Sequence, residues 1–176
     1  MIFVADYNPK WPQMFKEEKT LLSSAIGKWT VVIKHVGSTS VEGLGAKPII
    51  DMVACVEELK TADDFCISNL EDAGYEYLPQ FEKLIPERRF FRKYAEDGST
   101  THQIHLVEES SDVYNKLILF RNFLRGHPEV AKAYEKEKRR LAPMFTDTTK
   151  YAQAKSEFVS KALEEAEIWM NGFSTE

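Results

Sequence analysis

Two short segments of the sequence contain the residue types that a phosphate and metal site requires. The first is the turn Gly37-Ser38-Thr39-Ser40, which directly follows a β-branched run over residues 30–36. Glycine lets a ligand approach the backbone, and successive N–H groups and hydroxyls can hold phosphate oxygens. The second is Asp51, an acid inside the apolar run over residues 49–56. Together they indicate a site where phosphate and a cation meet.

Asp51 needs a physical explanation, because a lone carboxylate in a buried strand costs several kcal/mol unless something compensates its charge. A cation, hydrogen-bond donors or a place at the edge of a cleft would each do so. Mg²⁺ is commonly held by one or two carboxylates together with substrate phosphates, so a magnesium ion is the expected cofactor. The alternative is a tight turn followed by a capped strand, and spacing alone does not choose between the two.

The two segments also carry a family resemblance. Gly37-Ser38 and Asp51, with twelve residues between them, resemble the motif of the nucleotidyltransferase superfamily. The whole run from His35 to Asp51 resembles more closely the GrpB-like family of uncharacterised proteins. The resemblance continues, over nearly the entire chain, through Tyr7–Pro12, Arg88–Lys93, His102–Leu106, Leu119–Pro128 and Tyr151–Lys155. It implies an α/β (α+β) fold with a nucleotidyltransferase-like mixed β-sheet flanked by helices, and a helical C-terminal region.

One position departs from the superfamily pattern. Nucleotidyltransferases usually carry a second acid two residues after the first, and here that residue is Val53. Residues two apart on a strand point to the same face, so the missing acid would have shared a metal with Asp51. Transfer with two metals normally needs several acids around the ions. The sequence does not show which acid, if any, replaces it.

The resemblance implies a set of site residues at the matching positions. For catalysis and metal binding they are Asp51 and His105, and for phosphate binding they are Gly37, Ser38, Thr39, Ser40, Lys47, Arg92, Arg121 and Lys155. His102 and His105 point to opposite faces of a strand, and we expect His105 to approach Asp51 as a ligand or general base. A buried histidine satisfied by its neighbours is the alternative.

The cationic candidates have structural alternatives as well. Lys155 lies in an apolar helical stripe that begins at Tyr151, where it could reach a phosphate or extend past the core to water. Arg121 and Arg125 lie one turn apart, either as a phosphate-binding face or as a solvated face paired with acids.

The arginine-rich strand is ambiguous in the same way. Alternation groups Arg88 with Arg92 on one face and Arg89 with Lys93 on the other, and only one face can line a site. A charged edge strand protected from aggregation is the alternative.

These residues predict a nucleotidyltransferase-like protein that binds a nucleoside triphosphate, or a related phosphorylated ligand, with Mg²⁺; the acceptor is unknown. The alternative is a noncatalytic nucleotide-binding or regulatory module that has lost part of its metal site, which Val53 favours. A third class is an assembly protein whose C-terminal helices form a homodimer. Metal dependence, turnover and solution mass would distinguish the three.

Composition narrows the class of protein. The chain has 176 residues and a formal net charge of −5, which argues against nonspecific nucleic-acid binding. Two cysteines, Cys55 and Cys66, have neither metal-ligand spacing nor the density of a disulfide scaffold. The apolar stretch Ile2–Ala5 is too short for a membrane span or signal peptide, so we expect a cytoplasmic protein without a membrane partner.

The elements that must position these residues follow from periodicity and turn chemistry. Expected helices cover residues 9–27, 61–74, 112–126 and 128–141, and a final long helix follows residues 147–149 and ends near Met170. Ser111 is the expected cap of the third. Expected strands cover residues 30–36, 49–56, 75–78, 88–94 and 101–107. We therefore divide the chain into an α/β core over residues 1–110 and a helical region over 111–176, packed as one unit.

Overall fold

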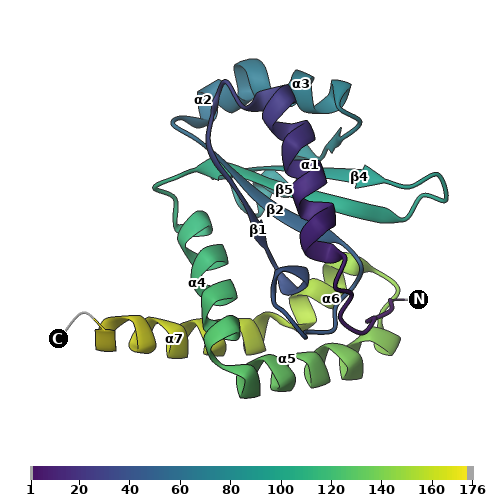
Figure 1. Cartoon of the computed structure of the whole chain (residues 1–176), viewed down its shortest axis with the longest axis vertical. Coiled ribbons are helices and arrows are strands. Elements are labelled where there is room, and N and C mark those ends of the chain that lie inside the picture. Colours follow the sequence, from purple (N-terminus) through teal and green to yellow (C-terminus); the bar gives the residue numbers. More distant parts are fainter. Residues whose placement is uncertain (1, 174–176) are drawn as a thin grey trace.

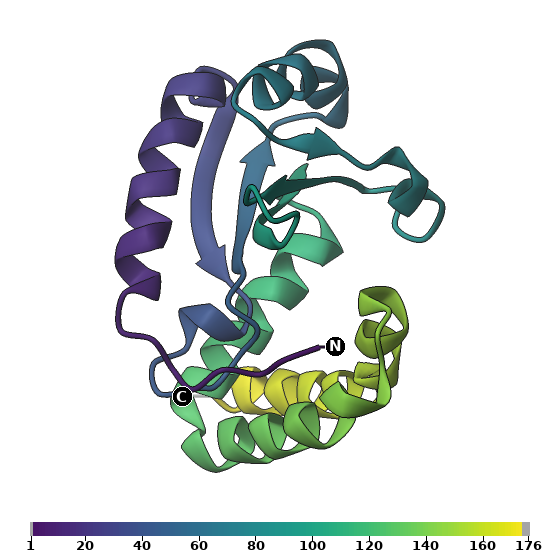
Figure 2. The same cartoon turned by 90° about the vertical axis from the view of Figure 1, so that its right-hand side faces the viewer.

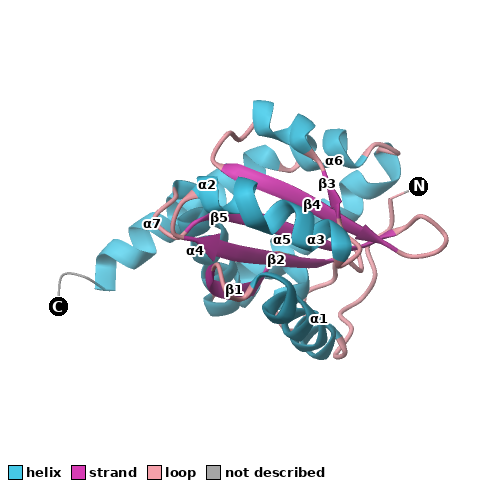
Figure 3. Cartoon of the chain, turned by 90° about the horizontal axis from the view of Figure 1, so that it is seen from above, coloured by secondary structure: helices cyan, strands magenta, loops and turns pink. Residues whose placement is uncertain are grey.

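The computed structural model describes residues 2–173, apart from the side chain of residue 173, and contains one five-stranded mixed sheet with helices on both faces (Figure 1). The strand order is β1-β2-β5-β4-β3, which can be followed in Figure 3. β2 and β5 are parallel, and the other neighbours are antiparallel. The strands are β1 (Thr30–Val36), β2 (Ile50–Val56), β3 (Glu76–Tyr77), β4 (Arg88–Tyr94) and β5 (Thr100–Glu108).

Helical segments connect and flank these strands. The α-helices are α1 (Trp11–Ile26), α2 (Leu59–Thr61), α3 (Ile67–Asp72), α4 (Asp112–Gly126), α5 (Pro128–Leu141), α6 (Thr148–Ala154) and α7 (Ser156–Phe173). Shorter segments are η1 (Ser38–Ser40), η2 (Ala62–Cys66), η3 (Pro79–Lys83) and η4 (Ala142–Met144). The mixed α and β architecture predicted from the sequence is confirmed. No helix within residues 2–173 combines the length and apolar character needed to cross a membrane.

The main hydrophobic core lies on the face of the sheet that α1, η2 and α3 cover. Apolar residues alternate along the strands, so one set from β2 and β5 points to this face and packs on Leu22 and Ile26 of α1 and Leu70 of α3. These side chains are fully buried, and each contributes about 1.5–3 kcal/mol relative to an exposed position. The first sheet face is therefore closed by apolar packing.

The opposite face is covered over only part of its length. α4 packs on one end through a small cluster that includes Val36, Val53 and Val107. The helices α5, α6 and α7 form a layer beyond the other end, as Figure 2 shows. Between this helical layer and the uncovered end of the sheet lies a cavity, and Asp51 faces it.

Two helix predictions were wrong in detail. The expected start at Thr61 is replaced by a start at Leu59, whose N–H donates to the Glu108 side chain of β5 (2.9 Å). The expected single C-terminal helix is divided at Lys155, where α6 ends and α7 begins. The Ser156 hydroxyl donates to the Gln153 carbonyl there (2.6 Å), a local bond of the kind that competes with regular helix.

Candidate functional site

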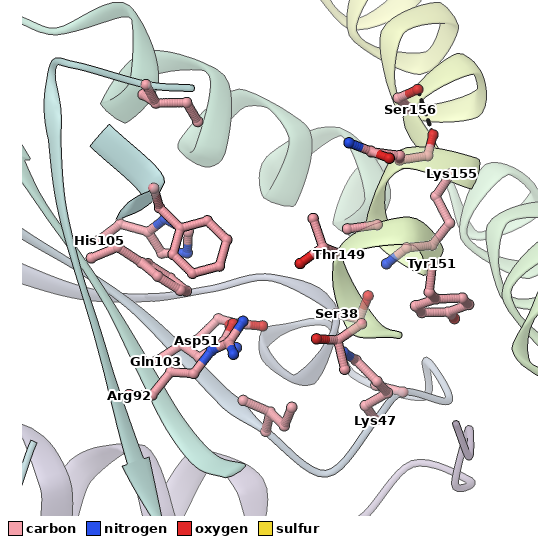
Figure 4. Close-up of a pocket in the computed structure, with 18 of the residues that line it drawn as sticks. Ser38, Lys47, Asp51, Arg92, Gln103, His105, Thr149, Tyr151, Lys155 and Ser156 are labelled. Carbon is pink, nitrogen blue, oxygen red and sulfur yellow. Dashed lines mark hydrogen bonds between the residues drawn. The ribbon is translucent and has the colours of Figure 1, made fainter. Parts of the chain in front are cut away.

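A cavity of about 440 Å³ opens between the sheet and the C-terminal helices. Figure 4 shows side chains from both parts of the chain pointing into it. Three groups of residues line it. The sheet and its loops contribute Ser38, Thr39, Ala46, Lys47, Ile49, Asp51, Arg88, Phe90, Arg92, Gln103 and His105; η3 and its exit contribute Phe81, Leu84 and Ile85; the C-terminal helices contribute Lys138, Thr148, Thr149, Tyr151, Ala152, Gln153, Lys155 and Ser156.

Asp51 lies in the floor of this cavity and is held on both sides. Its register partner on β5 is Gln103. With the amide turned to satisfy both neighbours, Gln103 donates to Asp51 Oδ1 (2.9 Å) and accepts from Arg92 Nε (3.2 Å). On the other side is Gly37, which has φ +67°, and a Cβ there would lie 2.6 Å from Asp51 Oδ2. Only glycine fits this close approach without strain.

The electrostatics of Asp51 reflect its setting. Burial raises its pKa to about 6, although Lys47, Lys155, Arg92 and Lys138 act in the opposite direction. It is the only acidic side chain that lines the cavity along residues 2–173. The cavity therefore carries an excess of positive charge around one carboxylate.

Lysines dominate the end of the cavity next to α6. The ammonium groups of Lys155 and Lys47 lie 4.4 and 5.5 Å from the centre of the Tyr151 ring, within the range of cation–π attraction. Burial lowers the pKa of Lys155 to about 8, helped by Lys47, and lowers that of Lys138 to about 7, helped by Lys155. Lys138 Nζ donates to the Gly45 carbonyl (2.5 Å). We call Lys47, Lys138 and Lys155 the lysine end.

The opposite end of the cavity combines aromatic rings with arginines. The guanidinium carbon of Arg88 lies 4.7 Å from the centre of the Phe90 ring, and that of Arg92 lies 5.4 Å from both Phe81 and Phe90. His105 Nδ1 faces Arg88 Nη1 at 3.2 Å. Burial, with a contribution from Arg88, lowers the pKa of His105 to about 3, so its imidazole is neutral at physiological pH. We call this set the aromatic end.

The alternation rule correctly predicted that Arg88 and Arg92 share one face of β4, and that His102 and His105 lie on opposite faces of β5. Arg88 and Arg92 face the cavity, while Arg89 points away and binds Asp63 through two hydrogen bonds (2.6 and 2.9 Å). His105 faces the cavity and His102 does not. The structure does not bring His105 directly beside Asp51 (Figure 4). The strand register places Gln103 opposite Asp51 and His105 opposite Val53. With a pKa near 3, His105 is also a poor general base.

The turn after β1 was expected to hold phosphate, and in the structure the Thr39 and Ser40 hydroxyls bond backbone carbonyls within the protein. Ser38 and Thr39 line the cavity, but the Thr39 hydroxyl already donates to the Ile49 carbonyl (3.1 Å). The Ser40 hydroxyl and N–H both donate to the Gly37 carbonyl, which closes the turn. Ser40 therefore supports the loop, and Gly37 makes room for Asp51.

The two arginines of α4 that were candidates for phosphate binding, Arg121 and Arg125, do not line the cavity. Arg121 was expected to bind phosphate, but its Nη1 donates to the His35 carbonyl (2.9 Å) and the guanidinium also bonds Asn122. The reason is that α4 covers the closed end of the sheet, so Arg121 binds the backbone of β1. His35 itself faces α1, where its ring stacks on Phe15 at 4.8 Å. Arg125 binds the Ser40 carbonyl through two nitrogens.

The residues present do not form a magnesium site by themselves. Along residues 2–173 no three His, Cys, Asp or Glu side chains gather closely enough to hold a metal. Val53, at the position of the usual second acid, is fully buried beneath α4. Asp51 offers one carboxylate among cations, whereas Mg²⁺ requires near-octahedral oxygen ligands. The cavity therefore offers one carboxylate beside several cations rather than a cluster of acids.

Sequence reasoning missed several lining residues, and two of them had a detectable signal. Lys138 lies on the buried stripe of α5 with Tyr134 and Leu141, the same charge-in-an-apolar-stripe pattern that identified Lys155. Gln103 lies two residues before His105 and therefore shares its strand face. Phe81 and Leu84 had no such signal, because the loop that contains them reaches the cavity only through the pairing of β3 with β4.

Comparison with known proteins places this chain in a family. The GrpB protein family matches residues 1–165. The glutamate-rich protein GrpB of Alkalihalophilus pseudofirmus is 35% identical over 93% of this chain and 95% of its own length. Protein YqkA of Bacillus subtilis is 36% identical over 94% of this chain, which spans only 47% of that relative. The crystal structure of the conserved protein GrpB from Enterococcus faecalis aligns with a TM-score of 0.83 and 33% identity, over 95% of this chain and 99% of that one. The chain therefore belongs to the GrpB family.

Proposed function

We propose that the chain binds a phosphorylated small molecule in this cavity, with a nucleoside triphosphate as the first candidate. The observation that carries the proposal is the convergence of Lys47, Lys138 and Lys155 near a single carboxylate. Burial depresses the pKa of each of these lysines, so their charged forms lack solvation that an anion would restore. A phosphate group supplies that charge.

The shape of the cavity supports one orientation of the ligand. The lysine end also presents the Ser38 and Thr149 hydroxyls (Figure 4), which suits phosphate oxygens. The aromatic end presents Phe81, Phe90 and the neutral His105, which suits a flat ring such as a nucleobase. The volume of about 440 Å³ lies in the range of small-molecule sites.

The lone carboxylate favours a binding or regulatory module over a nucleotidyltransferase. Transfer of a nucleotidyl group with two metal ions needs several acids, and the position two residues after Asp51 is the buried Val53. In the proposal the cations contact the phosphates directly. Any Mg²⁺ would arrive as part of the nucleotide complex.

Calorimetric titration tests this function. Inorganic triphosphate, ATP and GTP are titrated with and without Mg²⁺ into the wild type, Lys155→Gln and the control Lys161→Gln, whose side chain is exposed on α7. We expect metal-independent binding that Lys155→Gln weakens about tenfold or more, because a charged hydrogen bond is worth about 1.5–3 kcal/mol. Lys161→Gln should bind like the wild type.

Two results would count against the proposal. Absence of binding by every phosphorylated ligand removes the substrate class. Binding that requires Mg²⁺ and is unchanged in Lys155→Gln instead favours a metal-dependent enzyme and calls for a turnover assay.

A further inference from the structure

Arg88 is a desolvated cation without an acidic partner. Its guanidinium packs on Phe90, and its Nε is buried with no hydrogen-bond partner among the described residues. The charged neighbour that acts on it most is another cation, Arg92. A buried, unpaired charge is costly. The next residue along the strand, Arg89, does have an acidic partner, because its guanidinium donates two hydrogen bonds to the Asp63 carboxylate.

His105 limits what the Arg88 guanidinium can still bind. The neutral ring accepts from Nη1 at 3.2 Å and holds the planar group in place. The Nε side of the fork then remains for another acceptor, since guanidinium has five donors and no acceptor. The adjacent lining residues Phe81, Leu84 and Ile85 are apolar. A ligand group that enters here must be flat and must present acceptors.

We propose that Arg88 is the specificity-determining residue of the cavity and selects ligands that present a planar pair of adjacent acceptor atoms at the aromatic end. The inference rests on the proposed function, because the phosphate of the same ligand occupies the lysine end. Two ligand types carry such a pair, namely the O6 and N7 atoms of guanine and the carboxylate of a phosphorylated acid. Adenine places an amino donor against the fork and is disfavoured.

The experiment measures discrimination rather than affinity alone. Two ligand pairs, GTP with ATP and 3-phosphoglycerate with glycerol 3-phosphate, are titrated into the wild type, Arg88→Lys and the control Arg89→Lys. Inorganic triphosphate, which has no base or carboxylate, reports on the lysine end. In at least one pair we expect the wild type to bind the first ligand about tenfold to a hundredfold more tightly than the second. This is the discrimination that a bidentate contact between an arginine and two acceptor atoms typically gives.

Arg88→Lys keeps the positive charge and loses the two-pronged guanidinium, so the ratio of the two dissociation constants within each ligand pair should fall to near one. Inorganic triphosphate should still bind within about twofold of its wild-type affinity. Arg89→Lys should retain the ratio. A ratio that appears for GTP identifies the base as the source, and one that appears for 3-phosphoglycerate identifies a carboxylate. Thermal unfolding without ligand confirms that both variants fold.

Three outcomes would count against either the role of Arg88 or the proposed function. Equal affinities within both pairs, or a ratio that survives Arg88→Lys, refute the role of Arg88 while triphosphate binding leaves the proposed function intact. Failure of every ligand, triphosphate included, refutes the proposed function and this inference with it.

Discussion

Replacement of Asp51 by asparagine is expected to stabilise the protein at neutral pH. The pKa of Asp51 is about 6 in the folded chain against an ordinary 3.8. A pKa difference of one corresponds to about 1.4 kcal/mol, so ionisation of this carboxyl lowers the free energy of unfolding by about 3 kcal/mol. Asparagine resembles the protonated acid, and its side-chain oxygen can still accept from Gln103.

The sign of the pH dependence follows from proton binding. Between pH 3.8 and about 6 the folded chain retains a proton on Asp51 that the unfolded chain has lost, so the contribution of Asp51 to stability falls as pH rises through this window and levels off above it. Asp51→Asn should therefore match the wild type near pH 3.5 and exceed it by about 3 kcal/mol at pH 7.5.

Urea unfolding across this pH range measures the difference. Asp72→Asn is the control, because its carboxylate is exposed at the end of α3. The prediction fails if the Asp51→Asn variant is less stable than the wild type at pH 7.5, or equally stable at every pH. Either result would refute the view that desolvation dominates the energetics of Asp51.

The same variant separates direct anion binding from binding through a metal. If phosphate contacts the lysines directly, removal of the Asp51 charge should strengthen the binding of inorganic triphosphate without Mg²⁺. If Mg²⁺ bridges Asp51 and the phosphates, Asp51→Asn should weaken binding in its presence.

Two further substitutions test the packing around the site and the far face of the sheet. Gly37→Ala should lower the free energy of unfolding by about 2–4 kcal/mol, and the control Gly43→Ala should lower it by only about 1–2 kcal/mol. Both glycines have positive φ, but only a Cβ at Gly37 would meet a neighbouring atom. Equal losses for the two variants in urea unfolding would show that the contact between Gly37 and Asp51 is not tight. Burial raises the pKa of Glu18, but hydrogen bonds from Lys93 (2.9 Å) and Tyr75 (2.7 Å) bring it below its usual value. Glu18→Gln should therefore lower the free energy of unfolding by about 3 kcal/mol at pH 7 and by progressively less below pH 4.5. A loss of stability that is the same at every pH would show that the charge of Glu18 does not stabilise the fold.

Local chemistry in the sequence determined most of the elements. The bounds predicted for β1, β4, α4 and α5 are those of the structure, and Ser111 caps α4 by accepting from the Tyr114 N–H (3.2 Å). Alternation grouped Arg88 with Arg92 on one face, since the period of a strand depends only on its own backbone, and the structure shows that this face lines the cavity. An isolated acid in an apolar run pointed to Asp51, and the family resemblance added Lys155; both side chains line the cavity.

Tertiary packing decided which of these residues meet. Glu108 caps α2 from β5, and α4 turns Arg121 toward β1. Lys138 reaches the cavity from a helix far along the chain, and the break at Lys155 directs that side chain toward Tyr151. Such contacts join segments distant in sequence, so no local pattern specifies them. The cavity with its lysine and aromatic ends exists because α4 closes one part of the sheet and leaves the rest open.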